Sequence, residues 1–110
     1  MKICITSQGK TLEDRAEERF GRAAYFIVID SETGRYEAIE NSAAAGAGGV
    51  GPKAAQVLIR HGVEALVSGQ VGGNAREVLA ASGIALYVCH GGTVRDAFDR
   101  FRANTLERAG

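Results

Sequence analysis

Several features that commit a chain to one functional class are scarce in this sequence. The 110 residues carry thirteen basic and thirteen acidic side chains, so there is no charge excess to attract nucleic acid or a membrane surface. No apolar run approaches the length of a membrane span, and no secretory signal pattern follows Met1. We therefore expect a cytoplasmic protein with neither nucleic acid nor a membrane among its partners.

Cysteine is also scarce, with only Cys4 and Cys89. A reducing cytosol disfavours a disulfide between them, and both lie in apolar runs typical of buried strands. The four ligands of a closed zinc site are missing as well. No clustered carboxylates and no Ser, His and acid set are suggested by position, which argues against hydrolytic chemistry. The sequence favours a protein that is not an enzyme.

The length fits one domain covering residues 1–110. Apolar and β-branched runs predict five strands at 2–6, 25–29, 35–41, 63–68 and 84–89. Helical spacing predicts about three helices: one that begins at Pro52 and has Ala54, Val57, Leu58 and His61 on one face, one over 74–82, and one that starts with a capping box from Thr93 to Asp96.

The order of these elements predicts an α/β fold with a mixed sheet. An antiparallel hairpin is followed by helix and strand in alternation, which gives the strand order 3-2-1-4-5 with strand two antiparallel. Strands one and five are then two strand spacings apart, so Cys4 and Cys89 lie about 10 Å from each other, beyond the reach of a disulfide. Residues 7–24 form a long charged excursion between strands one and two, and excursions of that length are often functional.

A glycine-rich loop over residues 41–53 divides the chain. Its glycines, Gly46, Gly48, Gly49 and Gly51, let a ligand approach the backbone closely, and the helix that follows offers free N–H groups to an anion. A dinucleotide site would need an acidic residue at the end of the next strand, where Ser68-Gly69 stands. A P-loop would need Gly-Lys-Ser or Gly-Lys-Thr in place of Gly51-Pro52-Lys53-Ala54. We therefore interpret residues 41–53 as a loop whose backbone a ligand can approach closely.

Polar residues follow the predicted parallel strands where these end. Thr6-Ser7, Ser68-Gly69 and Cys89-His90 should meet at one edge of the sheet, which is where ligands bind in open α/β folds. Gly72 and Asn74 lie at the same edge, and Asn74 is expected to cap a helix or to donate to a ligand, the cap being favoured. Cys89 and His90 are side chains that bind iron, copper or zinc.

A group of short motifs resembles a known family. The pieces are Glu18-Arg19-Phe20-Gly21-Arg22-Ala23, Glu40-Asn41 with the glycine loop, His61-Gly62-Val63, and Gly69-Gln70-Val71-Gly72-Gly73-Asn74-Ala75. Together they are similar to the dinitrogenase iron-molybdenum cofactor biosynthesis domain, and the resemblance covers nearly the whole chain. It implies a ribonuclease-H-like fold without nuclease residues. Members include nitrogenase accessory and carrier proteins, and stand-alone orange proteins that bind a molybdenum-copper sulfide cluster.

The resemblance and the residues together predict a non-enzymatic carrier of a metal-sulfur cluster, either an iron-molybdenum cofactor precursor or a related Mo, Fe or Cu sulfide. In nitrogenase carriers a histidine commonly stands where this chain has Arg19, which pairs with an anionic cluster but cannot ligate a metal. The expected cluster-binding residues are Ser7, Arg19, Gly46, Gly48, Gly49, Gly51, Gly69, Gly72, Asn74 and His90, with Cys89 and His90 as metal ligands.

Two other functions stay open at this point. The same loop suits a small-molecule or phosphate-binding regulatory module without metal. The predicted edge strand at 35–41 suits an interaction module that docks onto cofactor-assembly proteins or onto a second copy of the chain.

Overall fold

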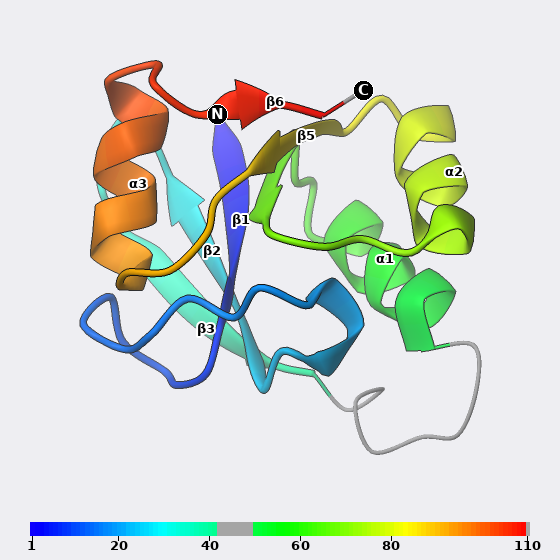
Figure 1. Ribbon diagram of the computed structural model, residues 1–110, viewed down its shortest axis with the longest axis horizontal. Helices are drawn as coiled ribbons and strands as arrows, with labels where there is room; N and C mark the ends of the chain where they lie inside the picture. The colour runs from blue at the N-terminus through cyan, green and yellow to red at the C-terminus, as the bar shows by residue number, and fades with distance from the viewer. Residues whose placement is uncertain (42–49, 110) are drawn as a thin grey trace.

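A six-stranded mixed sheet organises the computed structural model, which describes residues 1–41 and 50–109 (Figure 1). The strands are β1 (Lys2–Ser7), β2 (Tyr25–Asp30), β3 (Tyr36–Glu40), β4 (Ala65–Ser68), β5 (Ala85–Val88) and β6 (Glu107–Arg108). The helices are the 3₁₀ turn η1 (Phe20–Arg22), α1 (Val50–Arg60), α2 (Gly73–Ala81) and α3 (Val94–Arg102). None of these described helices is both long and apolar enough to cross a membrane.

The sheet order is β3-β2-β1-β4-β5-β6, so the predicted order of the first five strands is confirmed. β1 pairs antiparallel with β2 and parallel with β4, and β4 pairs parallel with β5. The prediction of five strands was wrong by one, because β6 pairs antiparallel with β5 at the far edge. β6 has only two residues, both exposed and charged, and so leaves no alternating pattern to find.

Helices cover both faces of the sheet. Residues of β1 alternate between them: Cys4 packs in the core under α1 and α2, whereas Ile3 and Ile5 pack in the core under α3. Cys89 belongs to the α3 side, so the two cysteines are separated by the sheet itself and both are free thiols. This confirms the expectation that they form no disulfide.

Three details of the predicted elements were wrong. α1 begins at Val50, ahead of Pro52, and ends at Arg60, so His61 directly follows the helix. α2 begins at Gly73 with Gly72 as its N-cap residue, so Asn74 does not cap this helix. β4 and β5 begin later than expected, because their ladders start at the paired residues Ala65 and Ala85.

The capping box of α3 is confirmed. The Thr93 hydroxyl accepts a hydrogen bond from the Asp96 amide at 3.1 Å, and the Asp96 carboxylate accepts one from the Thr93 amide at 3.0 Å. The bond from the Thr93 amide is the main reason that the pKa of the Asp96 carboxyl is lowered. Phe98 is buried against the sheet. α3 therefore starts where its sequence predicts and covers one face.

The excursion between β1 and β2 folds back over the carboxyl ends of β1 and β4. The Glu17 amide donates to the Thr6 carbonyl at 2.8 Å, near the carboxyl end of β1. Next to β4, the Gln70 amide donates to the Glu18 carbonyl at 2.5 Å and the Phe20 amide donates to the Gln70 carbonyl at 2.9 Å. These two bonds attach the excursion to the end of β4.

Phe20 and Gly69 make this attachment close. The Phe20 ring is buried and stacks on Phe26 with ring centroids 5.6 Å apart, which anchors η1 in the core. A Cβ at Gly69 would lie 2.8 Å from the Glu18 carbonyl oxygen, so only glycine admits the chain at this distance.

Asn41 ties the end of β3 to the same excursion. Its side-chain amide donates to the Ala23 carbonyl at 2.8 Å and to the Gly21 carbonyl at 3.3 Å, and the residue is buried. Residues 42–49 of the glycine loop lie outside the described residues.

Asn41→Ala should destabilise the fold by about 1–3 kcal/mol, because two carbonyl groups lose a buried donor. Asn74→Ala should change the free energy of unfolding by less than about 0.5 kcal/mol, because Asn74 is exposed and caps nothing. Urea unfolding of both variants measures the difference. Equal effects would show that Asn41 does not carry this connection.

Gly69→Ala should destabilise by about 1–3 kcal/mol, because its methyl group pushes Glu18 away from the end of β4. Gly73→Ala is the matched control: a Cβ there meets nothing within 4 Å, and alanine favours the helix that Gly73 begins. The control should be neutral or more stable than wild type in the same urea experiment. A Gly69→Ala variant as stable as the control would disprove the close contact.

Candidate functional site

A surface depression of about 430 Å³ lies between the excursion and the start of α2. It is lined by Arg19, Phe20, Gly21, Arg22, Gln70, Val71 and Gly72. Because Gln70 follows the end of β4, the depression lies at the carboxyl ends of the parallel strands, where the sequence places a ligand. The excursion covers part of that edge and forms one wall of the depression.

Two arginines give this wall its charge. Arg19 has a side chain that is 64% exposed, with its Nε 3.8 Å from the Glu17 carboxylate. Arg22 is exposed in the last turn of η1, and no carboxylate of the described residues lies within salt-bridge distance of it. Since η1 is anchored by Phe20 and lies against α1, both guanidinium groups project from a fixed turn.

The opposite wall is formed by Gln70, Val71 and Gly72. Gly72 precedes α2 in an extended conformation and no side chain caps the helix, so the first N–H groups of α2 are left for solvent or a ligand. A Cβ at Gly72 would meet nothing within 4 Å, which leaves room at this end. Arginines and a helix amino terminus both favour negative charge. The depression is therefore suited to an anion.

The predicted site residues fall into several groups. Gly72 lines the depression together with Arg19, and Asn74 is exposed in the first turn of α2. Gly69 has no side chain and so allows Glu18 to lie close to the end of β4. Gly51 lies in the first turn of α1, whereas Gly46, Gly48 and Gly49 are outside the described residues.

Ser7 is fully buried at the end of β1. Its hydroxyl donates to the Gly9 carbonyl at 2.7 Å and accepts from the Gly9 amide at 3.1 Å. Thr6 and Ser68 are buried nearby, with their hydroxyl oxygens 3.0 Å apart. These hydroxyl groups hold the strand ends and the excursion together.

Cys89 and His90 leave β5 in different directions. The Cys89 thiol is buried in the α3 core, 4.0 Å from an Arg100 nitrogen; burial raises its pKa and Arg100 partly opposes that shift. His90 has a side chain that is 65% exposed, and its Nδ1 lies 2.9 Å from the Glu18 carboxylate. Of the two predicted metal ligands, His90 is the accessible one.

Two residues of this edge were missed as site residues: Glu18 and Arg22. Glu18 and Arg22 stand in the Arg-Phe-Gly-Arg motif and its flank, so the motif could have indicated them. Gln70 takes part through its backbone, and its pairing with the excursion leaves no pattern in the sequence.

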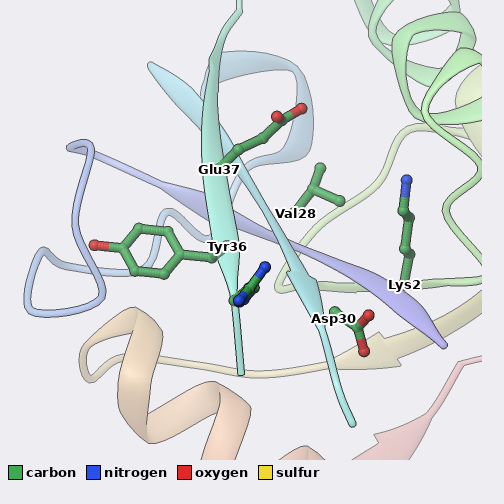
Figure 2. Close-up of a pocket in the computed structure, with 6 residues that line it drawn as sticks. Lys2, Val28, Asp30, Tyr36 and Glu37 are labelled. Atoms are coloured by element: carbon green, nitrogen blue, oxygen red, sulfur yellow. The ribbon is translucent and has the colours of Figure 1, made fainter. Parts of the chain in front are cut away.

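A smaller depression of about 240 Å³ lies at the opposite end of the sheet. Figure 2 shows Lys2, Asp30 and Glu37 around it, with Val28 between them. Charges of both signs mix there, and the parallel strand β1 begins rather than ends at this point. It lacks the concentration of positive groups found beside Arg19 and Arg22.

Two solved structures are similar along nearly the whole chain. The apo form of the orange protein from Desulfovibrio gigas has a TM-score of 0.95 and 37% identity, over 99% of this chain and 92% of that one. A Thermotoga protein, described as a candidate NifB protein, has a TM-score of 0.87 and 45% identity, over 97% of this chain and 91% of that one.

An uncharacterized protein from Methanocaldococcus jannaschii is 30% identical over 98 residues, which is 86% of this chain and 83% of that protein. The family model described as dinitrogenase iron-molybdenum cofactor matches residues 1–104. The chain therefore belongs to the dinitrogenase iron-molybdenum cofactor family.

Proposed function

We propose that this protein is a non-enzymatic carrier that binds an anionic metal-sulfur cluster in the depression between η1 and α2. The observation that carries the proposal is the pairing of two exposed arginines, Arg19 and Arg22, with the uncapped amino end of α2 across one depression. The family, which is named for the iron-molybdenum cofactor, supplies the class of cargo.

A cluster that brings its own sulfides suits these groups. Its sulfides accept hydrogen bonds from backbone N–H and guanidinium groups, and its negative charge pairs with Arg19 and Arg22. Among the described residues no three His, Cys, Asp or Glu side chains gather as a metal site.

The glycine loop completes the proposed site. Gly46, Gly48 and Gly49 follow Asn41, which is tied to η1, and Gly51 lies in the first turn of α1, against which η1 packs. We include these glycines in the site as residues that let the cargo approach the backbone. Gly72 and Asn74 are included on the α2 side, and a cofactor-assembly protein is the proposed recipient.

Replacing both arginines should weaken binding of tetrathiomolybdate, an anionic molybdenum sulfide. An exposed charge contact contributes up to about 1 kcal/mol, or about fivefold in Kd, so Arg19→Gln with Arg22→Gln should raise Kd by about 25-fold. Wild-type affinity should also fall as salt is added. Titration followed by visible absorption measures both effects.

Arg35→Gln with Arg60→Gln is the matched control, since it removes the same charge from exposed positions away from the depression. It should leave Kd within about twofold of wild type. An equal loss of affinity for tetrathiomolybdate in the two double variants would indicate non-specific electrostatic attraction. Displacement of the cargo by inorganic phosphate at equal concentration would favour a phosphate-binding module instead.

Cys89→Ala should leave the affinity for tetrathiomolybdate within about twofold of wild type. The thiol packs under α3, and the burial that raises its pKa disfavours the thiolate that a metal requires. Loss of a small buried side chain should lower the free energy of unfolding by about 1 kcal/mol. A large loss of affinity with unchanged stability would instead support Cys89 as a ligand.

A further inference from the structure

We propose that β3 is a docking edge that accepts an extended segment of a partner protein, bearing lysine or arginine side chains, as an added strand of the sheet. The edge contains none of the residues that line the depression between η1 and α2. The inference therefore goes beyond the proposed function and does not depend on what that depression binds.

The edge is open along a whole strand. β3 is the first strand in the sheet order, and among the described residues it pairs only with β2. The opposite edge is formed by β6, which has two residues and is too short to template a further strand. No proline interrupts the five residues of β3, so a ladder of backbone hydrogen bonds can form along all of it.

Hydrogen bonds at the two ends of β3 determine which residues face β2. The Asp30 amide donates to the Arg35 carbonyl at 2.8 Å, and the Asn41 amide donates to the Ala24 carbonyl at 3.0 Å. Residues that exchange hydrogen bonds with a neighbouring antiparallel strand alternate along the chain. The backbone groups of the odd-numbered residues from 35 to 41 therefore point toward β2.

The even-numbered residues of β3 then have backbone groups that point outward. These residues are Tyr36, Ala38 and Glu40. Their N–H and C=O groups are spaced as an added strand requires, and hydrogen bonds of this kind supply most of the affinity when a peptide joins a sheet edge.

Charge distinguishes the possible occupants of the edge. β3 carries two exposed glutamates, Glu37 and Glu40, and no basic residue. A second copy of the chain would bring its own two glutamates into the same short ladder, and neighbouring like charges destabilise strand pairs. Lysine or arginine in the added strand would instead pair with these carboxylates. The edge thus favours a basic segment over a second copy.

The two faces of β3 offer contacts for alternate side chains of the added strand. Ala38 packs on the α3 side of the sheet and Ile39 on the α1 side, so Tyr36 and Glu37 lie on opposite faces, and Figure 2 shows them leaving β3 in different directions. Tyr36 is 43% exposed and offers its ring to a cation. Glu37 lines the depression of about 240 Å³ together with Val28, which can support the apolar stem of a long basic side chain.

The probe is a capped hexapeptide of alternating lysine and valine, and the comparison is the same peptide with glutamate in place of lysine. Wild type should bind the lysine peptide at least about 10-fold more tightly, because each basic side chain that pairs with a carboxylate adds to the difference. Binding should slow amide hydrogen exchange at Tyr36, Ala38 and Glu40, as measured by NMR. Equal binding of the two peptides, or protection confined to other segments, would refute the docking edge.

Ala38→Pro removes an outward N–H from the middle of the edge and leaves the bonds between β3 and β2 in place. It should raise Kd for the lysine peptide by about 10-fold or more, with a urea midpoint close to that of wild type. Unchanged affinity in the folded variant would refute the proposal. A wild-type dimer that this variant converts to a monomer, without binding of the lysine peptide, would assign the edge to a second copy and also overturn it.

Reversing the charge of the edge provides a test that does not depend on proline. Glu37→Lys with Glu40→Lys should make the protein prefer the glutamate peptide. Glu77→Lys with Glu107→Lys is the matched control, because it makes the same charge change at exposed positions in α2 and β6. The control should keep the preference of wild type for lysine. The same reversal in both double variants would show that net charge, rather than β3, selects the peptide.

Discussion

The short parallel pairing between the excursion and Gln70 is the interaction on which the site depends. It consists of two backbone hydrogen bonds, from Gln70 to Glu18 and from Phe20 to Gln70, and it requires the missing side chain of Gly69. Without it, Arg19 and Arg22 would belong to a loose surface loop. With it, Phe20 inserts into the core and both arginines line the depression beside the start of α2.

The two depressions show why position and charge must be considered together. The one beside Lys2, Asp30 and Glu37 is smaller and electrically mixed, and it lies where the parallel strands begin. The one beside Arg19 and Arg22 combines positive side chains with the positive end of a helix dipole. Of the two depressions, only the one beside Arg19 and Arg22 has side chains and a helix dipole that both contribute positive charge. It lies at the carboxyl ends of the parallel strands, where ligands bind in open α/β sheets.

Local signals in the sequence predicted much of the fold. The run from Tyr25 to Ile29, the Thr93 capping box and the alternation of helix and strand after Pro52 each reflect short-range physics, and together they give the sheet order. The pairing at Gln70 could not be predicted, because it joins charged residues to a loop without any periodic pattern. The orientation of Cys89 also depended on which face of β5 meets α3, and that is decided by packing.

The central claim is that an anionic cluster binds at the carboxyl ends of the parallel strands. The most direct measurement is a map of backbone amide chemical-shift changes during titration with tetrathiomolybdate. We predict changes concentrated at Arg19 to Arg22 and Gln70 to Asn74, with little change around Lys2 and Asp30. A map centred on the Lys2 depression, or changes spread evenly over the chain, would contradict the claim.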